Sequence, residues 1–504
     1  MTRPSLKDRT CGILLHPTSL PGPASSGDLG RASHQFVDFL ASASVGVWQM
    51  LPVGPPGYGD SPYSAQSAFA GSPLLVALDD YDQLPERSTS NRVQFGDAWR
   101  MREPRLRELA SRAPHKLVEA FIEKNASWLP DFTLFRALKR AHQHVQWTLW
   151  EKDVRDRKPA ALQRAKKELA DEVYFEACVQ WLFAEQWTRL RERARDKNVT
   201  LVGDLPIFVA HDSADVWQHR ERFQLDSAGE PACVAGVPPD YFSATGQRWG
   251  NPLYDWARMK KTGYAWWIAR FAQMLERFDA IRLDHFIGFH RYWAIPATCP
   301  TAIDGAWTKG PGADFFSAVE KALGTLPMIA EDLGAITPAV TRLRRQFGFP
   351  SIRILQFAFG TDPSAPKFMP HNYVHNAVVY TGTHDNDTTL GWFREEGGDE
   401  STRTREQTEH ERKTARAYLA SNGDAIHWDM IRACAASVAR WAIFPMQDVL
   451  GLGNDARMNH PGRDAGNWAW RCTSDALSPH VAERLATLAQ LYGRAPTGAQ
   501  RKLP

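Results

Sequence analysis

Three carboxylates follow short apolar runs of the sequence and are its strongest chemical signal. Asp284, Glu331 and Asp385 stand at or just after the ends of such runs, with Arg282 and His384 close to two of them. Two carboxyl groups that face one acetal can transfer a glycosyl group: one attacks the anomeric carbon, and the other protonates the departing oxygen and then deprotonates the acceptor. The third acid can stabilise the oxocarbenium-like charge. Arg282 and His384 have the chemistry to bind sugar hydroxyls and to keep the nucleophile ionised.

Other interpretations fit single members of this set. An acidic residue after a strand can simply cap the next helix, although three acids with Arg and His beside them fit that interpretation less well. Residues 384–387, His-Asp-Asn-Asp, also have the ligand types of a divalent-metal site. Adjacent residues at a strand end do not all point the same way, so we predict no metal there.

These acids need strands to position them, and short apolar runs recur along the chain. We expect eight buried strands, within residues 12–16, 46–53, 200–209, 280–286, 328–333, 351–359, 377–383 and 441–450. Helix-like segments separate most of them, so strand and helix alternate and predict a parallel sheet with right-handed crossovers. Eight such units favour a closed (β/α)8 barrel of the TIM type, in which functional residues gather at the carboxyl ends of the strands.

Two long segments interrupt this alternation. Residues 80–198 are too long for one crossover and contain charged, periodic helical stretches, so we expect a helical insertion between the second and third strands. Residues 229–256 are rich in Gly, Pro and aromatic side chains with little periodicity, which predicts a loop insertion that covers the active site. We expect residues 1–504 to form a single catalytic unit and 496–504 to be a flexible tail.

The composition excludes several classes of protein. Of the 504 residues, 43% are hydrophobic and 23% charged, so a disordered or fibrous chain is excluded and a large core is expected. The net charge of +3 comes without a run of like charges or a basic stripe, so we predict no nucleic-acid partner and no binding to membrane surfaces. Nothing in the sequence predicts a protein partner.

The sequence also argues against a membrane span, a secretory leader and a cysteine-based site. The longest uncharged stretch, 39–59, is interrupted by Ser, Gln and Pro, and the apolar run after Arg9 is broken by His16 and Pro17. We therefore expect a cytoplasmic protein. The six cysteines are far apart with no C-x-x-C pair, so neither a disulfide scaffold nor a zinc site is predicted.

Tryptophan is the compositional exception. The chain has 19 Trp, and aromatic residues make up 11% of the sequence. Aromatic faces suit the C–H-rich faces of sugar rings, but tryptophans are also usually buried, so carbohydrate binding and a large aromatic core both remain open.

Four long motifs resemble those of one known family. They lie at residues 12–22 (GILLHPTSLPG), 57–64 (GYGDSPYS), 236–243 (GVPPDYFS) and 467–471 (NWAWR), and the resemblance runs nearly from end to end of the chain. The chain is similar to the amylomaltases, the 4-α-glucanotransferases of glycoside hydrolase family 77. The resemblance implies a (β/α)8 barrel with inserted subdomains, retention of the α-configuration, and no required cofactor or metal.

The resemblance also implies roles for the acids and their neighbours. Asp284 is similar to the nucleophile that forms the covalent glucosyl-enzyme, Glu331 to the general acid/base, and Asp385 to the residue that stabilises the transition state by binding the hydroxyls of the distorted sugar. Arg282 and His384 resemble the residues that support these acids. For retention, the carboxyl groups of Asp284 and Glu331 should lie about 5 to 5.5 Å apart, and Glu331 must keep its proton at neutral pH.

Aromatic residues are implied on both sides of the cleavage point. Tyr63 matches the tyrosine that stacks on the cleaved sugar, while Tyr241, Phe242, Gln247 and Trp249 match a flexible aromatic loop that covers the acceptor side. Simple packing is the alternative role of Tyr63 and Trp249.

One further acid and two departures from the family pattern complete the prediction. Asp204 is expected either to help hold the site or to serve a helix cap or turn. Many family members have Arg where this chain has Ile287, and an acidic residue where it has Gly360, followed here by Asp362. These departures bear on subsite affinity and chain-length preference, since all three carboxylates are intact.

The sequence therefore predicts transfer of α-1,4-glucan segments from maltodextrin, starch or glycogen-derived donors to the 4-hydroxyl of glucose or another glucan. Net hydrolysis by an amylase-like relative is the second enzymatic interpretation. A non-catalytic glucan-binding protein is a third, and the complete acidic triad with its Arg and His neighbours argues against it.

Overall fold

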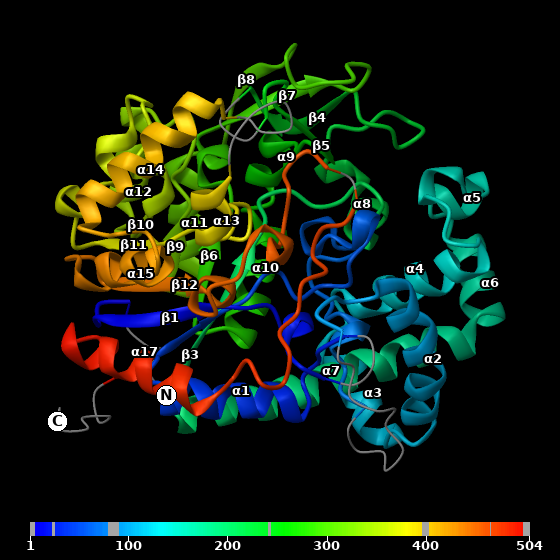
Figure 1. The fold of residues 1–504 in the computed structure, drawn as a ribbon. Helices are drawn as coiled ribbons and strands as arrows, with labels where there is room; N and C mark the ends of the chain where they lie inside the picture. Colours follow the sequence, from blue (N-terminus) through cyan, green and yellow to red (C-terminus); the bar gives the residue numbers. More distant parts are fainter. Residues whose placement is uncertain are drawn as a thin grey trace.

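A closed barrel of parallel strands forms the centre of the molecule (Figure 1). The structure is a computed structural model and describes residues 6–22, 26–78, 90–239, 243–395, 403–463 and 465–496. The barrel order is β1-β12-β11-β10-β9-β6-β3-β2, so the first and last strands pair to close it. Its strands are β1 (Thr10–Leu14), β2 (Val47–Gln49), β3 (Thr200–Leu205), β6 (Ala280–Leu283), β9 (Met328–Ala330), β10 (Ser351–Ile354), β11 (Ala377–Tyr380) and β12 (Trp441–Pro445).

The barrel confirms the predicted fold class. Each of the eight barrel strands overlaps one of the predicted apolar runs, and β1, β2, β6, β9, β11 and β12 are buried along their whole length. Most strands are shorter than their runs, because several runs continue into other structure. After Ile354 the chain forms a 3-10 helix (Leu355–Ala358), and after Pro445 it forms α16 (Met446–Val449), both largely buried. Burial outside the sheet therefore explains the extra apolar residues.

Helices connect the strands and cover the barrel. α10 (Ala265–Arg277) shows why they form: it buries Trp266, Trp267 and Phe271 on one face and contacts β3 and β6. The other α-helices outside the insertion are α1 (Arg31–Ser42), α8 (Ala214–Gln218), α9 (Trp256–Lys261), α11 (Ala313–Leu323), α12 (Pro338–Gln346), α13 (Thr389–Arg394), α14 (Arg405–Leu419), α15 (Ile426–Ala436) and α17 (Pro479–Leu491).

A helical insertion separates β2 from β3, as predicted, and extends to one side of the barrel in Figure 1. It contains α2 (Phe95–Ser111), α3 (His115–Lys124), α4 (Leu129–Ala141), α5 (Lys152–Arg155), α6 (Pro159–Glu168) and α7 (Ala170–Asp196). α7 contacts α2, α3 and α4 as well as α1, α10 and β3, and α4 contacts α8, so both helices join the insertion to the rest of the molecule.

The sequence predicts an irregular loop at residues 229–256, and the structure differs from this prediction. The segment contains β4 (Cys233–Val237) and β5 (Gln247–Pro252), which form an antiparallel sheet with β7 (Arg291–Pro296) and β8 (Ala306–Lys309) in the order β5-β4-β7-β8. β4 pairs with β7, which lies far along the chain: the antiparallel register places Cys233 opposite Pro296. A strand of five residues with so distant a partner leaves little periodicity in the sequence, which explains the error.

Within the described part of the chain, no helix is long and apolar enough to cross a membrane. Residues 497–504, most of the predicted flexible tail, lie outside the described residues.

Candidate active site

Two charged side chains project into the barrel interior from neighbouring strands. The register of β3 against β6 places Asp204 opposite Arg282, and Arg282 Nη1 donates to Asp204 Oδ2 at 2.6 Å. Both side chains are almost fully buried, with exposures of 0% for Asp204 and 3% for Arg282. Because an unpaired buried charge is very costly, this pair is stable only as a pair. Asp204 lies within β3 and contacts Arg282, which contradicts its alternative role in a helix cap or turn.

Asp284 and Glu331 are the first residues beyond β6 and β9, and both remain fixed by the barrel. The Asp284 N–H donates to the carbonyl of Leu205, and the Glu331 N–H donates to that of Leu283, each at 3.1 Å. Arg282 joins their side chains: Nη1 lies 2.9 Å from Asp284 Oδ1, and Nη2 lies 3.3 Å from Glu331 Oε2. One guanidinium therefore holds both carboxyl groups together.

The environment of Glu331 favours its protonated form. Burial and the negative charge of Asp284 raise its pKa well above that of an ordinary glutamic acid, although Arg282 and a backbone hydrogen bond oppose this. The backbone donor is the N–H of His285, 2.5 Å from Glu331 Oε2. His285 adopts a left-handed conformation, with φ of 49°, at the turn that follows β6. Glu331 can thus hold a proton within the site.

The environment of Asp385, in contrast, favours its ionised form. Burial acts to raise its pKa, but His384 and a hydrogen bond from Asn459 outweigh burial and lower the pKa below that of an ordinary aspartic acid. His384 Nε2 lies 3.3 Å from Asp385 Oδ2, and Asn459 Nδ2 donates to Oδ1 at 2.7 Å. Asp385 is therefore an ionised carboxylate with both oxygens in polar contact.

Tyr63 connects the two groups of acids. Its hydroxyl donates to Asp204 Oδ2 at 2.8 Å, and its ring stacks on His384 with a centroid separation of 5.1 Å and an interplanar angle of 18°. Burial and the charges of Asp204, Asp284 and Asp385 raise the pKa of Tyr63 well above its ordinary value, although the charge of Arg282 opposes this. Its contacts go beyond the simple packing alternative.

The residues predicted for the acceptor side are only partly described. Trp249 of β5 is 37% exposed, and its ring makes an edge-to-face contact with His285, the residue that follows Asp284, with centroids 4.9 Å apart. Gln247 Oε1 accepts a hydrogen bond from Trp249 Nε1 at 3.2 Å. Tyr241 and Phe242 lie outside the described residues.

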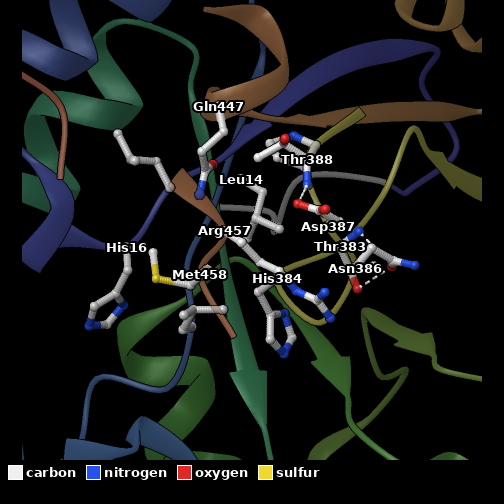
Figure 2. A pocket seen from close by; sticks show the side chains of 13 residues that line it. Leu14, His16, Thr383, His384, Asn386, Asp387, Thr388, Gln447, Arg457 and Met458 are labelled. Carbon is white, nitrogen blue, oxygen red and sulfur yellow. Dashed lines mark hydrogen bonds between the residues drawn. The ribbon is translucent and has the colours of Figure 1, made fainter. Parts of the chain in front are cut away.

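A groove extends from His384 along the mouth of the barrel. It consists of two adjoining pockets that share His16, Leu51 and Met458. The first also includes His384 and Gln447, and the second includes polar and aromatic residues as far as Asp60, Phe95 and Trp468. Figure 2 shows His16, Met458 and His384 along the first pocket.

The side chains of residues 384–387 do not converge as metal ligands would. Asp387 accepts hydrogen bonds from Asn454 Nδ2 and from the Thr388 N–H, both at 2.7 Å, whereas Asp385 contacts His384 and Asn459. Among the described residues, no group of three or more His, Cys, Asp or Glu side chains is arranged to hold a metal ion.

Comparison with known proteins identifies the family. The sequence profile described as 4-alpha-glucanotransferase matches residues 15–477. The chain belongs to the 4-alpha-glucanotransferase family. It is 47% identical to the 4-alpha-glucanotransferase of Thermus thermophilus and 46% identical to that of Synechocystis sp., with 96% and 97% of this chain and 99% of each relative covered. Its structure matches that of an amylomaltase from Streptococcus agalactiae in complex with acarbose, with a TM-score of 0.90, 34% identity, and coverage of 97% of this chain and 100% of that one.

The structure also reveals functional candidates that the sequence analysis missed. Arg457, Asn459 and Trp468 follow β12 in a segment without periodicity, and they contact Asp385, His384 or Tyr63. Trp468 lies in one of the motifs that carry the family resemblance, which was the available signal. Nothing in the sequence singles out Arg457 or Asn459.

Proposed function

We propose that this chain transfers α-1,4-glucan segments to the 4-hydroxyl of glucose or another glucan by a retaining double displacement. One observation carries the proposal: Arg282 holds Asp284 and Glu331 together, and the surroundings of Glu331 raise its pKa. Retention needs a nucleophile and a proton donor about 5 to 5.5 Å apart, closer than an inverting pair with water between them. That separation, predicted from the sequence, remains a prediction.

In the first step, Asp284 attacks the anomeric carbon of the donor sugar. The glycosidic C–O bond breaks, and the departing oxygen takes the proton of Glu331, so the reducing-end fragment leaves as a neutral alcohol. The product is a β-glucosyl ester on Asp284. Arg282 favours this step, since its hydrogen bond to Asp284 Oδ1 holds the attacking carboxyl group in place.

In the second step, the 4-hydroxyl of an acceptor glucan attacks the same carbon. Glu331, now ionised, removes the hydroxyl proton, the ester bond to Asp284 breaks, and a new α-1,4 bond forms. Two inversions give net retention, and both carboxyl groups return to their starting protonation states.

The remaining site residues stabilise the sugar between these steps. Asp385 and His384 bind its hydroxyls, and the negative charge of Asp385 favours the positive charge that develops on the ring. Tyr63 offers an aromatic face to the sugar, and its hydrogen bond to Asp204 fixes the ring position. We propose that further donor glucose units bind along the groove beyond His384.

The acceptor side must keep water away from the glucosyl-enzyme. Trp249 lies beside the site, and we propose that it and the surrounding segment 229–256, including Tyr241 and Phe242, cover the acceptor and limit hydrolysis. Substrates of this reaction are α-1,4-glucans and glucose; the acarbose complex of the Streptococcus agalactiae amylomaltase supports α-glucan binding by this fold. A cytoplasmic location remains a prediction from sequence.

Incubation of the purified chain with maltotriose tests this function. Transfer gives glucose and a ladder of longer maltodextrins while the number of reducing ends stays constant. A rise in reducing ends with only glucose and maltose as products would instead indicate a hydrolase. No product at all would reject both activities.

A further inference from the structure

The turn that carries Asp385 is not held by its own strand. β11 ends at Tyr380, so the strand does not set the direction of a carboxylate five residues further on. Within the turn, the N–H and hydroxyl of Thr383 both donate to Asn386 Oδ1 at 3.0 Å. These bonds close the turn without fixing the side chain of Asp385, which is 34% exposed.

Arg457 and Asn459, from the segment after β12, make the contacts that hold Asp385 and its turn. Asn459 Nδ2 donates to Asp385 Oδ1 at 2.7 Å, and the Asn459 N–H donates to the His384 carbonyl at 3.1 Å. Arg457 Nη2 donates to the Asp385 carbonyl at 2.8 Å. Arg457 Nε also donates to the Asn459 carbonyl at 2.7 Å, so the two residues fix each other. In Figure 2 the Arg457 side chain reaches toward the turn.

We propose that Asn459 and Arg457 are positioning residues for Asp385: Asn459 orients its carboxylate, and Arg457 fixes its backbone. The inference rests on the proposed role of Asp385 in stabilising the transition state. Its physical basis is that a carboxylate helps only if it is already oriented when charge develops on the sugar.

The side-chain amide of Asn459 is well suited to orienting the Asp385 carboxylate. His384 contacts Oδ2 and Asn459 contacts Oδ1, so each oxygen of Asp385 has one protein partner and keeps lone pairs for sugar hydroxyls. An amide donates this hydrogen bond at any pH and adds no charge. A carboxyl group in its place would donate only while protonated, and would repel Asp385 once ionised.

The same segment supplies a matched control. Asn454 Nδ2 donates to Asp387 Oδ2 at 2.7 Å, the same bond length and donor as at Asn459, but to an acid outside the proposed catalytic set. With maltotriose as substrate, we expect Asn459→Ala to lower kcat about tenfold, as loss of one charge-assisted hydrogen bond would, with KM changed less than about twofold. Asn454→Ala should keep kcat within about twofold of the parent chain.

A second variant gives a signature that a purely structural role would not produce. In Asn459→Asp the introduced carboxyl group donates to Asp385 while protonated, so the ratio of variant to parent kcat should rise as the pH is lowered from neutral and fall as it is raised. Arg457→Gln removes the hydrogen bonds to the carbonyls of Asp385 and Asn459 without introducing an acid, so its kcat should fall about threefold to tenfold without the rise at low pH expected of Asn459→Asp. Thermal unfolding of each variant identifies any that fails to fold.

The outcomes separate this inference from the proposed function. If Asp385→Asn is inactive while Asn459→Ala matches Asn454→Ala and the Asn459→Asp ratio is flat with pH, the positioning role is wrong. If the parent chain gives no transfer, or Asp385→Asn retains full activity, the proposed function itself fails.

Discussion

Arg282 shows how one buried residue sets the protonation of the site. Its guanidinium contacts Asp204, Asp284 and Glu331, and burial, which would lower its pKa, is outweighed by these three acids, which raise it. One positive charge balances only one of the three acids. Ionisation of all of them would leave two uncompensated negative charges inside the barrel. Burial and the Asp284 charge raise the pKa of both Asp204 and Glu331, and that of Glu331 is raised well above its ordinary value, so we assign the proton to Glu331.

This balance predicts the pH dependence of transfer. Glu331 must be protonated to release the leaving group, and its raised pKa keeps it protonated above the pH at which a free glutamic acid ionises. Activity should therefore persist to neutral pH and fall as the pH rises through the pKa of Glu331. The measurement is kcat/KM for maltotriose against pH. Glu331→Gln should lower the rate by about 10² to 10⁴-fold, and its kcat/KM should no longer fall as the pH rises. A parent profile that is flat through the alkaline range would contradict this assignment.

Among the elements, those with a local sequence pattern could be predicted. The apolar runs revealed all eight barrel strands, and acids at strand ends such as Asp284 and Glu331 revealed the catalytic candidates, because carboxyl ends of parallel strands meet at one end of a barrel. The β4–β7 pairing and the contact of Asn459 with Asp385, 74 positions apart, left no such pattern. Long-range pairing of irregular segments depends on tertiary packing, which neither periodicity nor residue type encodes.

Gly360, one of the two departures from the family pattern, lies next to a buried carboxylate. A Cβ atom at this position would lie 3.2 Å from Glu411 Oε1 of α14, so a carboxylate from another element stands beside the glycine. Glu411 is buried and accepts hydrogen bonds from Arg403 Nη1 at 2.6 Å and from Trp392 Nε1 at 2.9 Å.

We therefore expect Gly360→Glu to place two carboxylates together and to reduce the free energy of unfolding by about 1–3 kcal/mol. Gly360→Ala is the control, with an expected loss below about 1 kcal/mol, since only a small shift of Glu411 is needed. Denaturant unfolding at neutral pH measures both. Equal stability of the two variants would show that Glu411 does not oppose an acidic residue here.

Across the molecule as a whole, the two ends of the barrel have different tasks. The proposed chemistry lies at the carboxyl ends of the strands, whereas the opposite end is closed by Arg494, which is fully buried. Its guanidinium donates to the backbone carbonyls of Thr10, Cys434, Ala435, Ser437, Ala439 and Arg440. These carbonyls belong to the starts of β1 and β12 and to the end of α15 and the loop after it, so one side chain joins the first and last strands of the barrel.

Replacement of this residue should affect stability without affecting chemistry. Arg494→Met removes all of these buried, charge-assisted hydrogen bonds at once, and we expect a loss of about 3 kcal/mol or more in the free energy of unfolding. At about 25 °C the folded variant should keep the parent kcat. Arg484→Met, on the exposed face of α17 over Trp428, should cost less than about 1 kcal/mol. A large change in kcat of folded Arg494→Met would contradict the separation of the two ends.

The central claim is that Asp284 carries the glucosyl group while Glu331 moves the proton, and a trapped intermediate tests it most directly. The Glu331→Gln variant should be mixed with α-maltotriosyl fluoride, whose leaving group departs without an acid, so the first step proceeds and the second is slowed. Mass spectrometry of the digested protein should find a maltotriosyl adduct on the peptide that contains Asp284. The double variant that also carries Asp284→Asn should show no adduct. Fluoride release with the adduct on another residue, or with no adduct at all, would contradict the account.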